Sequence, residues 1–151
     1  MHMIYTNMTK KALRIAFDAH KEQVDKTGLP YVFHPFHLAE QMCDEISVCV
    51  ALLHDVVEDT PITFDDLVRA EMADEVIAAL RLLTHDPSIS YMEYIKAIKE
   101  KGNKTALAVK LADLHHNSDV TRLEIVDDRM CERLKKYKNA IDYLEAQYID
   151  F

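Results

Sequence analysis

The sequence predicts an all-α, multi-helix bundle, and three observations predict it. Only two glycines and four prolines occur in 151 residues, too few for a sheet-rich fold with many tight turns. Apolar residues recur three or four positions apart along much of the chain. A chain of 151 residues is long enough to bury a core without a structural metal or disulfide, and its 49% of hydrophobic residues argues against disorder. We therefore expect a single domain over residues 1–151 with seven or eight helices.

Capping residues and helix breakers bound the first five expected helices in turn. Gly28 ends the first helix, and Pro35 opens the second. Asp44 caps the third, a strongly apolar helix that continues to Thr60. Thr63 is the expected N-cap of the fourth. We place these helices at residues 9–28, 36–42, 44–60, 64–71 and 74–83.

The second half of the chain carries three more helix signals. Ser90 and Glu93 have the spacing of a capping box, and Gly102 stands where the C-terminal cap of that helix belongs. The next helix spans residues 104–118. The last, over residues 127–148, has apolar side chains spaced three or four apart.

Charge and cysteine content exclude several classes of partner. A net charge of −8 disfavours nucleic acid and anionic membranes, which bind dense Lys/Arg patches. No apolar run reaches the roughly 18 residues needed to span a bilayer, and the N-terminus lacks signal-peptide features. Three cysteines without metal-type pairing suggest reduced thiols and a cytoplasmic protein. Self-association into a homo-oligomer stays open.

Four polar residues interrupt the most apolar predicted helix. His54 and Glu58 are four residues apart, as are Asp55 and Asp59, so each pair shares a helix face. Burying such groups is costly unless each is paired or bound to a cation. Mixed imidazole and carboxylate ligands suit Mn, Fe, Zn or Co. The alternative is a core histidine satisfied by a neighbouring carboxylate.

Two other segments place polar residues beside apolar ones. Asp113 ends the apolar run 106–113, with His116 and Asn117 in the following turn. His34 precedes a proline, so we expect it to be extended at a helix entrance. Singly, each observation is weak, because an internal Asp can equally be hydrogen-bonded to a neighbour.

Three ordered motifs connect these segments: P-Y-x-x-H-P at residues 30–35, L-H-D-x-x-E-D-T at 53–60, and K-L-A-D-x-x-x-N at 110–117. With them the sequence resembles the HD-domain metal-dependent phosphohydrolases, over roughly residues 12–125. The nearer resemblance is to the hydrolase domain of RelA/SpoT proteins and to the small alarmone hydrolases. It implies Mn²⁺-dependent removal of the 3′-pyrophosphate of (p)ppGpp, a small phosphorylated nucleotide.

The resemblance also implies a role for each matching residue. The metal ligands would be His34, His54, Asp55 and Asp113. The acidic pair that orients and deprotonates the attacking water would be Glu58 and Asp59, since a carboxylate one turn from a ligand can accept that proton. Substrate contacts would be Lys26, Tyr31 and Asn117. These last three have structural alternatives: a solvated cation, a core aromatic and a helix-end amide bonded to backbone.

Some positions depart from the family pattern. Asp25 stands where the family usually has an arginine that stacks on the purine, and a carboxylate there would repel phosphate. Asp119 likewise replaces a usual arginine. The arginine usual two residues after the Ala-Asp pair has no counterpart either, because Asp113 is followed by Leu114, His115 and His116. Four cationic or titratable residues would compensate for this loss of positive charge if they converge: Lys104, His115, His116 and Arg122.

Two alternative functions follow from these departures. One is an HD phosphohydrolase acting on another small phosphorylated metabolite, such as a nucleoside monophosphate. The other is a catalytically idle module that binds metal and nucleotide. Retention of both Glu58 and Asp59 argues against the idle module, which needs no proton acceptor.

Overall fold

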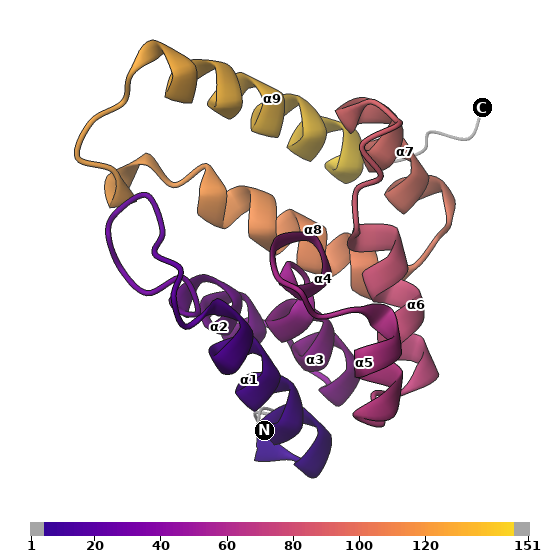
Figure 1. The fold of residues 1–151 in the computed structure, drawn as a ribbon. Coiled ribbons are helices and arrows are strands. Elements are labelled where there is room, and N and C mark those ends of the chain that lie inside the picture. Colours follow the sequence, from indigo (N-terminus) through magenta and orange to yellow (C-terminus); the bar gives the residue numbers. More distant parts are fainter. Residues whose placement is uncertain (1–4, 147–151) are drawn as a thin grey trace.

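The computed structural model describes residues 5–146, and within them every named element is helical. Eight α-helices longer than one turn, the single-turn α4 and the short 3-10 helix η2 succeed one another (Figure 1). Their bounds are α1 (Asn7–His20), α2 (Phe33–Glu40), α3 (Glu45–Leu53), α4 (Val56–Asp59), α5 (Phe64–Arg69), α6 (Asp74–Leu83), α7 (Tyr91–Glu100), α8 (Lys104–Asn117), η2 (Val120–Arg122) and α9 (Asp128–Glu145). The all-α prediction is confirmed.

Helix α3 lies at the centre of the bundle. Its last seven residues, 47–53, are all buried, because the segment is apolar on every side. It packs against α1 and α2 on one side and against α6 and α8 on another (Figure 1). The two residues that follow its last turn, His54 and Asp55, therefore enter the interior of the protein.

Helices α8 and α9 complete the bundle. α8 packs on α3, and α9 lies beside α8 and α7 (Figure 1).

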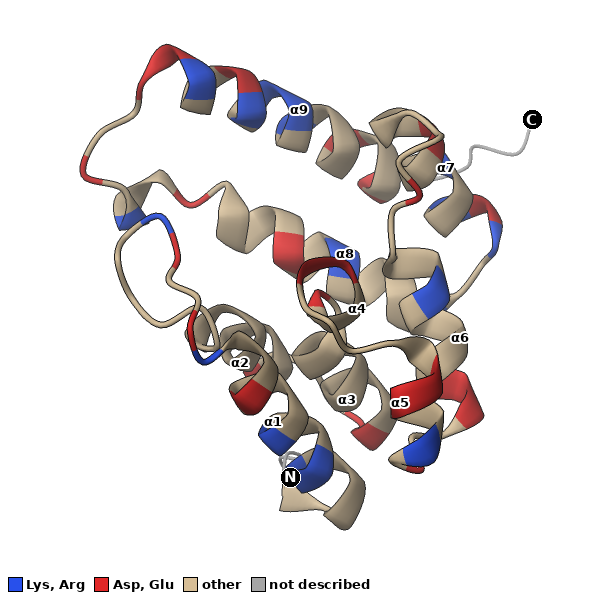
Figure 2. Ribbon diagram, in the orientation of Figure 1, with Lys and Arg blue, Asp and Glu red and all other residues tan. Residues whose placement is uncertain are grey.

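Figure 2 shows basic residues along α9 and acidic residues on α4 and α5. Within residues 5–146, no helix combines the length and apolar character needed to cross a membrane.

The first expected helix ends earlier than the sequence suggested. α1 stops at His20 instead of continuing to Gly28, and residues 21–32 form a loop. The carboxylate of Asp25 accepts hydrogen bonds from the backbone N–H groups of Thr27 (2.8 Å) and Leu29 (3.0 Å). An aspartate that binds nearby backbone competes with helix formation. Gly28 follows with φ at +84°, a conformation that favours glycine.

The expected continuous helix over 44–60 is wrong, because the chain turns at His54 and Asp55. α3 ends at Leu53, and α4 begins at Val56. No proline or glycine marks this turn. The expectation that His34 is extended is also wrong: it lies in the first turn of α2, where the following Pro35 is tolerated.

Most expected helix caps are present. The side chains of Asp44, Thr63 and Ser90 each accept a backbone N–H bond at a helix start, and Ser90 forms the expected capping box. Gly102 follows α7 with φ at +66°. The last helix extends to Glu145 in the described chain, and the predicted end near residue 148 lies outside the described residues.

Leu52→Ala should lower the free energy of unfolding by about 2–5 kcal/mol, because it empties fully buried space at the centre of α3. Urea titration followed by circular dichroism measures the loss. The matched control is Leu29→Ala, since that side chain is 54% exposed and should change stability little. Equal losses in both variants would contradict the central place given to α3.

Candidate metal centre and active site

Three of the four predicted metal ligands meet inside the bundle. His34 comes from α2, His54 from the turn after α3, and Asp113 from α8. One ligand atom from each lies within 4.8 Å of the other two. All three are nearly inaccessible, with 3%, 5% and 6% of their surface exposed. Segments far apart in sequence thus form one His/His/Asp cluster that can hold a metal ion.

His54 presents a buried ring nitrogen to two carboxylates. Its Nδ1 lies 2.7 Å from the backbone oxygen of Ala51, which can only accept, so Nδ1 carries a proton. The other nitrogen, Nε2, lies 2.9 Å from Asp55 Oδ2 and 3.5 Å from Asp113 Oδ1, without a well-aligned hydrogen bond to either. Burial alone would lower the pKa of His54, but Asp55 and Asp113 raise it well above its usual range. A divalent cation in place of the Nε2 proton fits this arrangement.

The fourth predicted ligand, Asp55, contacts the cluster through His54. It is not among the three residues whose ligand atoms all lie within 4.8 Å, but its Oδ2 neighbours His54 Nε2. The same oxygen accepts a hydrogen bond from the hydroxyl of Tyr31. Burial and the charge of Asp55 raise the pKa of Tyr31, so the hydroxyl stays a donor. Tyr31, expected in a base pocket, therefore also fixes a predicted ligand.

The carboxylate of Asp113 is surrounded by donors. Lys110 Nζ lies 3.0 Å from Oδ2, while His34 Nε2 (2.9 Å) and Asn117 Nδ2 (3.0 Å) lie near Oδ1. Burial alone would raise the pKa of Asp113, but Lys110 and the histidines His34 and His54 hold it well below its usual range. The charge of Asp113 in turn raises the pKa of Lys110 despite its burial. Asp113 is thus charged at neutral pH.

Glu58 faces the cluster across a cavity of about 170 Å³, which His54, Asp55 and Asp113 also line. Its carboxylate accepts a hydrogen bond from the backbone N–H of His85. Burial, and repulsion by Asp55, raise the pKa of Glu58 despite that bond. Asp59 lies at the end of α4 and does not line this cavity, although burial and Asp55 raise its pKa too.

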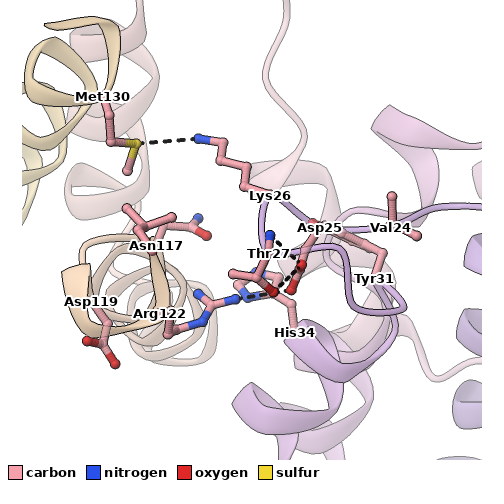
Figure 3. Close-up of a pocket in the computed structure, with 11 residues that line it drawn as sticks. Val24, Asp25, Lys26, Thr27, Tyr31, His34, Asn117, Asp119, Arg122 and Met130 are labelled. Carbon is pink, nitrogen blue, oxygen red and sulfur yellow. Dashed lines mark hydrogen bonds and ion pairs between the residues drawn. The ribbon is translucent and has the colours of Figure 1, made fainter. Parts of the chain in front are cut away.

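A second cavity of about 190 Å³ lies on the His34 side of the cluster (Figure 3). All three predicted substrate contacts line it: Lys26, Tyr31 and Asn117. The two cavities have no lining residue in common, but His34 in one bonds Asp113 in the other. The His/His/Asp cluster therefore lies between two cavities, which contain every predicted site residue except Asp59.

Comparisons with known proteins identify relatives of this chain. No family model matches the chain. The bifunctional (p)ppGpp synthase/hydrolase SpoT of Escherichia coli K12 is 33% identical over 122 residues, covering 72% of this chain and 17% of SpoT. The guanosine-3′,5′-bis(diphosphate) 3′-pyrophosphohydrolase of Haemophilus influenzae is 34% identical over 116 residues, covering 68% of this chain and 17% of that enzyme. The chain spans about a sixth of the length of these curated relatives.

A solved structure of a metazoan SpoT orthologue, described as hydrolysing ppGpp, matches the fold with a TM-score of 0.74. It is 26% identical, and the match covers 93% of this chain and 87% of that one. This chain is a RelA/SpoT hydrolase-like HD domain. The resemblance inferred from the three motifs is thereby confirmed.

The two aspartates that depart from the family pattern, Asp25 and Asp119, are both paired in this HD domain. Asp25 forms an ion pair with Arg122, whose Nη2 lies 3.4 Å from Asp25 Oδ2 (Figure 3). Burial would raise the pKa of Asp25, but hydrogen bonds from Thr27 and Leu29 and the Arg122 charge lower it. Asp119 is likewise engaged, because it accepts hydrogen bonds from Thr121. Arg122 also lines the cavity of Figure 3.

Only two of the four residues considered as compensating cations come near the cluster of the HD domain. Arg122 lines the second cavity, and the His116 ring contacts His34. Burial and the charges of His34 and Arg122 lower the pKa of His116 to about 4, so its ring is neutral at pH 7. Lys104 and His115 instead line a separate pocket that contains none of the predicted site residues.

Two cations near the cluster were missed by the sequence analysis. Lys110 stands three residues before Asp113, and its place in the K-L-A-D motif was the available signal. Lys136 reaches the Glu58 cavity from α9 and stacks on Tyr91, with its Nζ 4.1 Å from the ring centre. Nothing in the local sequence around Lys136 distinguishes it from its basic neighbours.

Lys110→Met should lower the free energy of unfolding of the metal-free protein by about 3–5 kcal/mol, because it leaves Asp113 buried without its cation. Urea unfolding at neutral pH measures this. Lys135→Met is the matched control: Lys135 also pairs with an acid three residues away, Glu132, but on the surface. Its loss should stay below about 1 kcal/mol. Similar small losses in both would contradict a structural role for the buried pair.

Proposed function

We propose that this HD domain is a metal-dependent phosphohydrolase that removes the 3′-pyrophosphate of (p)ppGpp-like nucleotides, with Mn²⁺ as its metal. The observation that carries the proposal is the buried His/His/Asp cluster, in which His54 Nε2 faces two carboxylates, set between two cavities. Similarity to proteins named as ppGpp hydrolases supports the choice of substrate.

The proposed metal ligands are His34, His54, Asp55 and Asp113. Two imidazole nitrogens and two carboxylates form a donor set suited to Mn²⁺ and its neighbours in the first transition row. A divalent ion held there acidifies water and polarises phosphoryl oxygens. Tyr31 and Lys110 keep the two carboxylates in place, the former by its hydrogen bond to Asp55 and the latter by its ion pair with Asp113.

The proposed proton acceptor is Glu58. Its carboxylate lines the same cavity as His54, Asp55 and Asp113, within reach of a water entering there. Burial raises the pKa of Glu58 and makes it a stronger base than an exposed glutamate. Asp59 acts on it through charge, since repulsion from Asp59 raises the pKa of Glu58 further. In the reaction, water gives a proton to Glu58 while its oxygen bonds the phosphorus attached to the ribose 3′ oxygen. The bond between that phosphorus and the 3′ oxygen breaks, and the 3′ oxygen takes up a proton, which yields pyrophosphate and a 3′-hydroxyl.

We infer that different parts of the substrate occupy the two cavities. Lys110 and Lys136 supply positive charge to the Glu58 cavity, where the pyrophosphate group would lie. The rest of the nucleotide would occupy the cavity of Figure 3, against Tyr31, Asn117 and Lys26. Arg122 gives this cavity a second cation beside Lys26.

We also infer that the protein acts in the cytoplasm on a small-molecule substrate, without a nucleic-acid or membrane partner. Cys43, Cys49 and Cys131 are all free, as expected in a reducing compartment. The net charge of −8 disfavours polyanionic partners.

Protein stripped of metal should not release pyrophosphate from ppGpp, and Mn²⁺ should restore the release. The physical reason is that the cluster without a cation offers no acidified water or polarised phosphoryl oxygen. Phosphate and pyrophosphate are assayed separately over a panel of phosphorylated nucleotides that includes nucleoside monophosphates. Full turnover in excess chelator would contradict the metal centre. Turnover of a nucleoside monophosphate but not of ppGpp would contradict the proposed substrate.

Glu58→Gln should lower kcat by about 100-fold or more while leaving the Mn²⁺ content unchanged, because the amide keeps the shape of the side chain but accepts no proton. Turnover is followed by pyrophosphate release, and metal content by atomic emission. Glu75→Gln, at the start of α6, is the control and should behave as wild type. An unchanged rate in Glu58→Gln would assign the proton to another group.

A further inference from the structure

His116 touches the metal cluster without belonging to its predicted ligands. Its Nδ1 lies 2.6 Å from Nδ1 of His34, and the two rings stack with centres 4.9 Å apart and planes 8° from parallel. His37 packs on His116 with ring centres 4.3 Å apart. The backbone oxygen of His116 accepts a hydrogen bond of 2.8 Å from Arg122. The ring is thus held by contacts from α2 and by the turn that follows α8.

The short Nδ1 to Nδ1 contact fixes where protons can lie. Two N–H groups cannot face each other at 2.6 Å, so one nitrogen donates and the other accepts. Without a metal, Nε2 of His34 lies 2.9 Å from Asp113 Oδ1 and can donate to it. For Nε2 to offer its lone pair to a cation instead, the ring proton must be on Nδ1 of His34. The Nδ1 of His116 must then be the acceptor, with its own proton on Nε2.

His54 provides the parallel within the same cluster. Its Nδ1 donates a hydrogen bond to the backbone oxygen of Ala51, so Nε2 is the nitrogen that can bind a metal. Within residues 5–146, the His34 ring has no carbonyl partner of this kind, and the ring of His116 lies at the equivalent place. Histidines that bind metals almost always donate their second N–H to such a partner, which sets both tautomer and ring orientation.

We propose that His116 is a positioning residue: it accepts the Nδ1 proton of His34 and so holds that ring with Nε2 directed to the metal. His116 itself is not a ligand in this arrangement. The inference rests on the metal centre of the proposed function, and it adds a residue to which the sequence analysis gave only a candidate phosphate contact.

The neighbouring His115 supplies a matched control. It lies on the same helix, but its side chain is 58% exposed, and it pairs with Glu145 on the surface at 2.9 Å. Replacing it removes the same chemical group from α8 without touching His34. Any difference between the two substitutions therefore reports the contact with His34.

The experiment measures Mn²⁺ affinity of the metal-stripped full chain by titration calorimetry, without substrate. His116→Ala should weaken binding by about 10–100-fold, because His34 loses its partner. His116→Gln should recover most of the affinity, since the Gln Oε1 can accept the same proton. His115→Ala should bind as wild type does. Thermal melting of each metal-free variant shows whether it is folded.

A second measurement does not depend on any variant. In the wild-type protein loaded with diamagnetic Zn²⁺, the ¹⁵N shifts of the His34 ring should show Nδ1 protonated and Nε2 coordinated. A protonated Nε2 would overturn the inference, as would wild-type Mn²⁺ affinity in His116→Ala. Equal weakening by Gln and Ala would rule out the acceptor role. Normal Mn²⁺ binding without ppGpp cleavage would instead defeat the proposed substrate alone.

Discussion

The buried carboxylate of Asp113 is the constraint on which the rest of the site depends. With 6% of its surface exposed, it can stay charged only where donors replace water. They come from several parts of the chain: Lys110 and Asn117 on α8 itself, and His34 on α2. The contact between His34 and Asp113 therefore joins α2 to α8, so the residues of the ligand cluster also stabilise the packing of these two helices.

The charges of this cluster explain why a divalent cation suits it. Asp55 and Asp113 carry two negative charges close to His54, whereas Lys110 is the one lysine or arginine paired with either of them in the described chain. Histidines that bind a metal must be neutral, and the group without its ion then has an excess of one negative charge. A divalent ion changes the net charge of the group from negative to positive. The site can then attract an anionic phosphoryl group.

The turn after α3 is as important as the ligands themselves. Asp55 lies in this turn with its Oδ2 2.9 Å from His54 Nε2, and α4, which begins at the next residue, carries Glu58 to the same cavity. The apolar α3 anchors this turn in the core, so the position of the ligands is set by helix packing.

Different parts of this site were predictable to different degrees. Apolar periodicity and caps such as Asp44 and Ser90 are local signals, and they placed most helices within a few residues. The three motifs also indicated His34, His54 and Asp113 before any geometry was known. The turn at His54 was not predictable, because no proline or glycine stands there to mark it. The distinction between His115 and His116 likewise depends on which helix packs against α8.

The pairing of Asp25 with Arg122 changes what the second cavity can recognise. Asp25 keeps its charge because Thr27 and Leu29 bind its other oxygen, so a phosphate that reached Arg122 would compete with a fixed carboxylate. Asp119 adds a second acidic side chain to the lining, against Lys26 and Arg122. The cavity is thus close to neutral in charge and suits a nucleoside held by shape and hydrogen bonds. Under the proposed function, attraction of phosphate falls mainly on the metal centre and on the lysines of the Glu58 cavity, Lys110 and Lys136.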